Sequence, residues 1–155
     1  MVGIPLTLLH LQDDGYHFLL EVIVFGKSFK AVLDTGASKT VFDKSTVERH
    51  LHTDMALQHT DMVSTGLGTT TMQSFILTVP DLQLGGLHLR QYDVAVLDLS
   101  TINYAYRQLA IDPVIGVIGG DILVKYGGII DYRTQLLRLR SRRLRKTTIT
   151  PIGKL

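Results

Sequence analysis

Asp34 is the residue whose surroundings in the sequence most clearly indicate chemistry. It follows the apolar run 31–33 and precedes Thr35 and Gly36. A carboxylate at the end of a buried strand is unfavourable unless its charge is used or hydrogen-bonded. Gly36 permits a sharp turn, and the Thr35 hydroxyl can hydrogen-bond to an equivalent loop. The pattern indicates a carboxylate for general acid/base chemistry, whereas the alternative is an ordinary solvated turn aspartate.

Period-two alternation and β-branched runs dominate the chain and favour a mostly β protein. Strands are therefore expected to position the Asp34 loop. Two hairpins are predicted, with glycine at each turn. Residues 18–33 turn near Gly26, and residues 75–97 turn at Gly85 and Gly86. Both hairpins end in the letters Ala-Val-Leu-Asp. This likeness indicates two similar halves packed around one core, and the alternative is ordinary strand composition.

Helices are few and short. The sequence predicts three of them, at residues 45–51, 100–109 and 122–126. Residues 45–48 have capping-box form at the start of the first helix, and Asp43 is a further candidate cap. Asp98 or Ser100 is the candidate cap of the second helix. Asp121, which directly precedes the third, is interpreted as a helix cap rather than as a catalyst.

Composition limits the class of protein. The chain has 155 residues and is 45% hydrophobic, which suits one globular domain over residues 1–155. The absence of cysteine excludes disulfides, thiolate metal sites and a cysteine nucleophile. No apolar run reaches the about 18 residues of a membrane-spanning helix, and the start lacks a basic segment, so we expect a cytoplasmic protein without membrane contact. The net charge of +2 is too small to indicate nucleic-acid binding.

Basic residues gather near the C-terminal end. Residues 129–139 are predicted to form one strand, and six basic residues without an acid lie between Arg138 and Lys146. One interpretation is a patch for anionic partners. The favoured interpretation is an edge strand whose leucines face the core and whose arginines face water. Residues 147–150 also alternate, and we expect them to pair either with residues 4–9 across a dimer interface or along an edge of the monomer.

Three blocks of the sequence resemble the retropepsin-like aspartic proteases, the relatives of retroviral proteases that include bacterial members. Residues 32–38 fit the signature apolar-apolar-Asp-Thr-Gly-Ala-Ser/Asp position by position. Residues 64–69 are similar in place and glycine content to the flap, the hairpin tip that closes over substrate. Residues 117–123, followed by 129–132, resemble the apolar-apolar-Gly segment, its helix and the next strand. The blocks occur in family order over about residues 18–139.

The resemblance implies a mostly β, retropepsin-like closed barrel with one lobe per chain. It also implies an endopeptidase that hydrolyses peptide or protein substrates with no metal or other cofactor. The implied site residues fall into four groups: the catalytic Asp34; its supporting loop Thr35, Gly36, Ala37 and Ser38; the flap Gly66, Leu67 and Gly68; and the structural motif Ile118 and Gly119.

Only one Asp-Thr-Gly triplet occurs, so the resemblance implies a homodimer in which two copies of Asp34 share one proton. The ionised carboxylate would activate water and the protonated one would polarise the scissile carbonyl. An alternative is a peptide-binding or dimerisation module of the same fold with little turnover. A remoter alternative is an RNA- or membrane-surface protein that uses the basic segment.

Overall fold

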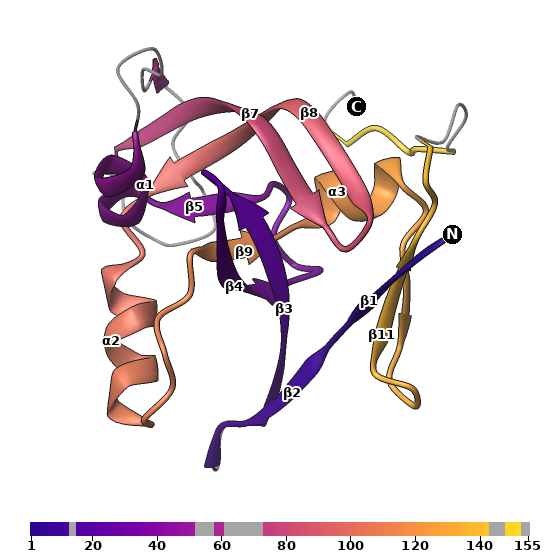
Figure 1. Ribbon diagram of the computed structural model, residues 1–155, viewed down its shortest axis with the longest axis horizontal. Coiled ribbons are helices and arrows are strands. Elements are labelled where there is room, and N and C mark those ends of the chain that lie inside the picture. The colour runs from indigo at the N-terminus through magenta and orange to yellow at the C-terminus, as the bar shows by residue number, and fades with distance from the viewer. Residues whose placement is uncertain (13–14, 52–57, 61–72, 143–147, 153–155) are drawn as a thin grey trace.

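The computed structural model describes residues 1–12, 15–51, 58–60, 73–142 and 148–152. Its main feature is a closed β-barrel (Figure 1). Neighbouring strands follow the order β3-β4-β9-β5-β8-β7, and β3 also pairs with β7, which closes the ring. The six barrel strands are β3 (Tyr16–Val24), β4 (Lys27–Leu33), β5 (Val41–Asp43), β7 (Ser74–Leu84), β8 (Leu87–Leu97) and β9 (Gly116–Ile118).

Two short strands extend this sheet beyond the barrel. The strand β2 (Thr7–His10) pairs with β3, and β6 (Gln58–Thr60) pairs with β7. The described part of the chain contains three helices, α1 (Lys44–His50), α2 (Ser100–Gln108) and α3 (Gly120–Lys125). The predicted mostly β barrel with short helices is therefore confirmed. No helix among the described ranges is long and apolar enough to cross a membrane.

Both predicted hairpins are present. Residue 25 and Gly26, with φ of 56° and 70°, form the two-residue turn between β3 and β4. Positive φ at both positions matches the right-handed twist of the strands, and glycine adopts it without strain. Gly85, with φ of 57°, lies in the turn between β7 and β8. These two long hairpins supply four of the six barrel strands.

The two hairpins occupy equivalent places in the barrel, as their shared ending predicted. Exchanging β3 with β7, β4 with β8 and β9 with β5 leaves the strand order unchanged. Ala31 pairs in parallel with Gly116 on β9, and Ala95 pairs in parallel with Val41 on β5. Each hairpin thus pairs in parallel with the short strand that follows the other hairpin, and Asp34 and Asp98 lie at equivalent strand ends.

A separate three-stranded sheet lies beside the barrel, at the right of Figure 1. Its order is β1 (Val2–Pro5), β11 (Leu136–Leu139) and β10 (Ile129–Asp131). The prediction of one strand over residues 129–139 is wrong, because a turn divides it. The Asp131 carboxylate accepts the main-chain N–H groups of Arg133 and Thr134, at 2.9 and 3.1 Å, which stabilises the turn.

The basic segment begins in the middle of this sheet. Leu137 and Leu139 are fully buried, as the alternation predicted, whereas Arg140 is exposed. The edge position predicted for this strand is wrong, since β11 pairs with β1 on one side and β10 on the other. Residues 148–150 form no strand, and the remainder of the basic run, residues 143–147, lies outside the described residues.

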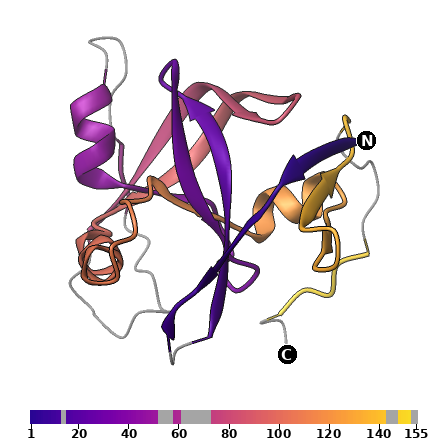
Figure 2. The ribbon, with the colours of Figure 1, turned by 60° about the horizontal axis from the view of Figure 1, so that its bottom comes forward.

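Two apolar clusters stabilise these elements. The larger fills the barrel and reaches β1, β11 and α3; its fully buried members include Ile4, Leu20, Phe42, Leu77, Leu89, Ile118, Ile122 and Leu137. The smaller lies beneath α2 and contains Leu11, Leu19, Val32, Tyr106 and Val114. The segment around α2 therefore has its own buried contact with β4, the strand that leads to Asp34. Figure 2 shows α2 as a separate helix on the flank of the barrel.

The helix starts agree with the sequence in one case and differ in two. Asp43 is the N-cap of α1 and accepts a hydrogen bond from the main-chain N–H of Thr46 at 3.2 Å. The N-cap of α2 is Leu99, neither Asp98 nor Ser100, although the Asp98 carboxylate accepts the main-chain N–H of Ser100 at 2.9 Å. The interpretation of Asp121 as a cap is wrong, because Gly119 is the N-cap of α3 and makes no side-chain cap bond.

Candidate active site

Asp34 directly follows β4 and lies at the surface of the barrel. Its main-chain N–H donates to the carbonyl oxygen of Ile118 at 3.0 Å, which continues the parallel pairing of β4 with β9. The preceding residue, Leu33, pairs with Ile118 in the register of the two strands. The backbone of Asp34 is therefore held by the barrel, while the residue itself is exposed.

The Asp34 loop folds back on its own carboxylate. The Gly36 N–H donates to Oδ1 of Asp34 at 3.0 Å, and the Ala37 N–H donates to the Asp34 carbonyl oxygen at 3.2 Å. The first bond orients one carboxylate oxygen toward the loop, and the second closes the turn of the main chain. Thr35 and Ser38 are exposed. The sequence-predicted loop residues are thus contiguous around one exposed carboxylate.

The Ile118-Gly119 segment supports the loop from below. A Cβ atom on Gly119 would lie 2.7 Å from the carbonyl carbon and oxygen of Lys39 and 2.8 Å from the Ala37 oxygen. These neighbours are main-chain atoms, so only glycine permits this approach. The Gly120 N–H also donates to the Ala37 oxygen at 2.8 Å. The first turn of α3 and the Asp34 loop therefore form one packed unit.

A buried polar cluster behind the loop was not predicted from the sequence. Oδ1 of Asp121 accepts from both the main-chain N–H and the hydroxyl of Thr40, each at 2.9 Å. The Thr40 Oγ1 in turn accepts the Gly119 N–H at 3.1 Å, and the Tyr92 hydroxyl donates to Oδ2 of Asp121 at 2.7 Å. The only signal of this cluster in the sequence was Thr40, which ends the loop and is followed by an apolar strand.

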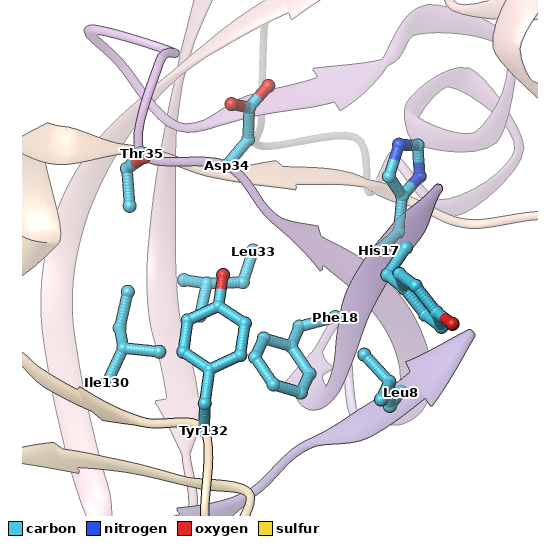
Figure 3. A pocket seen from close by; sticks show the side chains of 9 residues that line it. Leu8, His17, Phe18, Leu33, Asp34, Thr35, Ile130 and Tyr132 are labelled. Atoms are coloured by element: carbon cyan, nitrogen blue, oxygen red, sulfur yellow. The ribbon is translucent and has the colours of Figure 1, made fainter. Parts of the chain in front are cut away.

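A pocket of about 170 Å³ lies beside Asp34 (Figure 3). It opens between β2, β3, the Asp34 loop and β10. In Figure 3 the Asp34 carboxylate and the His17 imidazole extend to the same side, while Phe18 and Tyr132 lie below Asp34. The lining residues are Leu8, Tyr16, His17, Phe18, Leu33, Asp34, Thr35, Ile130 and Tyr132. Apolar side chains and polar groups therefore share the lining, and the polar groups include the Asp34 carboxylate and the His17 imidazole.

His17 and Tyr106 are further residues near Asp34 that the sequence analysis did not select. The His17 Nδ1 and the Tyr106 hydroxyl are 2.7 Å apart. Burial raises the pKa of Tyr106, and the nearby negative charge of Asp34 raises it further. Helix α2, which the sequence predicted as a helix without a role in the site, supplies this residue.

Asp98 takes the place of Asp34 in the other half of the barrel but has a different environment. Its carboxylate accepts the Ser100 main-chain N–H, and the Ser100 hydrogen bonds lower the pKa of Asp98. A carboxylate with a lowered pKa stays ionised to lower pH. The Asp98 carboxylate is hydrogen-bonded to the start of α2. It does not lie in the pocket beside Asp34.

The flap assignment falls outside the described residues, which do not include Gly66, Leu67 or Gly68. Among the ranges that the structure describes, no group of three or more histidine, aspartate or glutamate side chains could hold a metal ion. The residues that the structure brings together are accordingly the Asp34 loop, the Ile118-Gly119 segment and the pocket below them.

Comparisons with known proteins agree with this arrangement. A family model described as aspartyl protease matches residues 20–122. The fold is similar to a retropepsin-like aspartic protease from Rickettsia conorii, at 21% identity and a TM-score of 0.51, over 88% of this chain and 89% of that one. It is also similar to the retroviral protease-like domain of Ddi1 from Leishmania major, at 19% identity and a TM-score of 0.54, over 81% and 89%.

A third similar structure is the EIAV protease complexed with the inhibitor HBY-793. It is 19% identical, with a TM-score of 0.51, over 72% of this chain and 89% of that one. No curated protein matches the chain in sequence.

Proposed function

The chain belongs to the aspartyl protease family and has the retropepsin-like fold, and from this premise we propose that it is a peptide endopeptidase active as a homodimer. The observation that carries the proposal is the position of Asp34. A barrel strand holds its backbone, Gly36 orients one of its oxygens, and the residue is exposed beside a pocket that both apolar and polar side chains line. No ion pair neutralises it among the residues that the structure describes.

One carboxylate is insufficient for this chemistry. A close pair of carboxylates shares one proton, because both cannot ionise cheaply at short separation. The ionised member takes a proton from water, whose oxygen adds to the scissile carbonyl, while the protonated member donates to the carbonyl oxygen. Collapse of the tetrahedral species then breaks the C–N bond. The proton held by the first carboxylate goes to the leaving nitrogen, and a hydroxyl of the tetrahedral species returns a proton to the second carboxylate, which restores the dyad. Two copies of Asp34 supply both members.

Exposed apolar side chains around the site support assembly of two copies. Ile129 is 48% exposed on β10, the strand that borders the Asp34 pocket. Tyr132, just after β10, is 72% exposed and lines the pocket. Within the described residues β10 pairs only with β11, so its other edge can pair with a second chain. A twofold axis next to Asp34 would place the two β10 strands and the two carboxylates together.

The test is the substitution Asp34→Asn, which keeps the size of the side chain and removes its acid/base function. Purified parent and variant are incubated with a peptide library at acidic and neutral pH, and products are measured by mass spectrometry. We expect turnover to fall at least about a thousandfold. The matched control is Asp98→Asn, which changes the equivalent aspartate of the other half and should retain activity. Equal cleavage by the parent and Asp34→Asn would contradict the proposal.

The alternative function is a peptide-binding or dimerisation module with little turnover. The exposed Asp34 and its oriented loop favour a working site over this alternative. A statine-type transition-state mimic separates them, since a working dyad binds the mimic tightly only when Asp34 is present. Binding that is equal in the parent and in Asp34→Asn, without cleavage, would support the non-catalytic module.

A further inference from the structure

The pair formed by His17 and Tyr106 has no role in the reaction described above. His17 lies on β3 and lines the same pocket as Asp34. Its Nδ1 is 2.7 Å from the hydroxyl of Tyr106, a residue 89 positions later in the chain. The two rings lie with centroids 6.1 Å apart and are tilted by 56°. The contact therefore joins the wall of the pocket to helix α2.

Helix α2 is well placed to hold this pair. Tyr106 is 4% exposed and belongs to the cluster with Leu19 and Val32. Val32 is two residues before Asp34 on β4, and Leu19 is two residues after His17 on β3. The ring of Tyr106 is thus fixed by apolar packing against both strands, and only its hydroxyl is committed to His17.

A second anchor fixes the helix itself. The buried Asn103 donates from Nδ2 to the Val114 carbonyl oxygen at 3.1 Å, and its Oδ1 accepts the Val114 N–H at 2.8 Å. This pair of hydrogen bonds ties α2 to the segment that leads into β9. A hydroxyl carried by a helix fixed in this way restricts the orientation of the His17 ring.

The chemistry of the pocket follows from the groups that face His17. Titratable groups from the surrounding elements are Tyr16 on β3, Asp34 after β4, Tyr132 after β10 and Tyr106 on α2. His17 is the one group among these described residues that can carry a positive charge. Histidine changes its charge between about pH 5 and pH 8. His17 therefore gives the pocket a hydrogen-bond donor of the type that can carry a positive charge, in the same lining as Asp34.

We propose that His17, held by the Tyr106 hydroxyl, is a substrate-binding residue that selects a peptide with a carboxylate side chain beside the scissile bond. The inference rests on the proposed endopeptidase function and adds its specificity. The imidazole N–H that does not face Tyr106 donates to the glutamate or aspartate of the substrate, as a charge-assisted hydrogen bond. Tyr106 is a positioning residue, because it acts on the substrate only through His17.

The test uses binding, so that it does not depend on turnover. The carrier is the full chain with Asp34→Asn, which removes the competing carboxylate titration and prevents cleavage. The probes are fluorescent peptides with an apolar pair at the centre and either Glu or Gln at one flanking position, scanned over both sides. Dissociation constants are measured at about pH 5.5 and about pH 8, on either side of the range in which histidine titrates.

The expected result is a preference for one Glu peptide over its Gln partner. We expect it to bind about fivefold more tightly in acidic buffer and equally well in alkaline buffer. The preference disappears with His17→Gln. The matched control, His10→Gln, retains it, because His10 is exposed, stacks on Tyr16 and does not line the pocket.

Tyr106→Phe tests the positioning role, since it keeps the ring in its apolar cluster and removes only the hydroxyl. We expect an unchanged melting temperature, a smaller Glu preference and a displaced pH profile of that preference. A purely structural role would leave the pH profile of the preference in place.

The outcomes separate this inference from the proposed function. Equal binding of Glu and Gln peptides, a preference that survives His17→Gln, or no peptide binding at either pH would overturn the role of His17. Cleavage by the parent chain is measured in parallel with the same peptides. Cleavage that is unaffected by the substitution of His17 would support the endopeptidase function and refute the role of His17. A His17-dependent preference without cleavage would support the role of His17 in binding and contradict the endopeptidase function.

Discussion

Oδ1 of Asp121 accepts two hydrogen bonds from Thr40, one from its main-chain N–H and one from its hydroxyl, both at 2.9 Å. This contact joins the first turn of α3 to the end of the Asp34 loop across 81 residues. Thr40 is fully buried, so both donors depend on this carboxylate. The relationship explains how a loop with an exposed aspartate keeps a single geometry.

Asp121→Ala should destabilise the protein strongly. It leaves two buried Thr40 donors without their acceptor, and we expect the free energy of unfolding to fall by about 3 kcal/mol. Urea unfolding monitored by circular dichroism measures this change. Asp121→Asn is the matched control, because its amide oxygen still accepts from Thr40 while its charge is lost. A loss with Asn as large as that with Ala would show that the charge, rather than the acceptor, stabilises the loop.

Gly119→Ala should disturb the Asp34 loop directly. The new Cβ would lie 2.7 Å from main-chain atoms of Lys39, which cannot move without shifting the loop. We expect a loss of about 2 kcal/mol in stability and a larger proportional loss of peptidase activity. Gly120→Ala is the control, since its Cβ would meet the Ala37 oxygen at an ordinary 3.5 Å. If both alanine variants behave alike in unfolding and cleavage assays, the close approach at Gly119 has no special role.

Ile129→Lys should weaken the dimer. The substitution places a charge on the β10 edge that we assign to the contact between two copies, where an unpaired charge is unfavourable. We expect the dimer dissociation constant, measured by analytical ultracentrifugation, to rise at least about tenfold. Activity per chain should then fall on dilution more steeply than in the parent. Tyr104→Lys is the control, because Tyr104 is 60% exposed on α2. An unchanged dissociation constant for Ile129→Lys would place the interface elsewhere.

Asn103→Ala should loosen helix α2. Both main-chain polar groups of Val114 lose their partner in a buried setting, and we expect the free energy of unfolding to fall by about 2–3 kcal/mol. Chemical denaturation gives this value. The neighbouring variant Tyr104→Ala removes an exposed ring and should change stability by less than about 0.5 kcal/mol. Similar losses in both variants would indicate general helix weakening in place of a specific anchor.

Asp131→Asn should remove a pH-dependent part of stability. Hydrogen bonds from Thr134, together with Arg133 and Arg138, lower the pKa of Asp131. A carboxyl with a lowered pKa stabilises the folded state above its unfolded pKa of about 4, and that stabilisation is lost as the pH falls through the folded value. The parent should therefore be more stable than the variant at neutral pH, and the difference should vanish in strong acid. Thermal unfolding at a series of pH values measures it, and a difference that persists in strong acid would exclude Asp131 as its source.

The local patterns of the sequence were sufficient for the hairpins and for the loop that follows the first of them. Alternation of apolar and polar residues sets a strand's buried face, and Gly26 and Gly85 set the turns. The structure of residues 129–139 was harder to predict from local patterns. Its turn depends on Asp131 accepting main-chain hydrogen bonds, which apolar alternation alone does not reveal.

The sequence by itself determined the two hairpins, their glycine turns and the place of Asp34 directly after a strand, because each depends on residues close together in the chain. Only the tertiary structure decided which distant residues meet there. Asp121 meets Thr40 from 81 residues away and His17 meets Tyr106 from 89 residues away. Such contacts arise from the way strands pair around the barrel, and no local period or spacing encodes them.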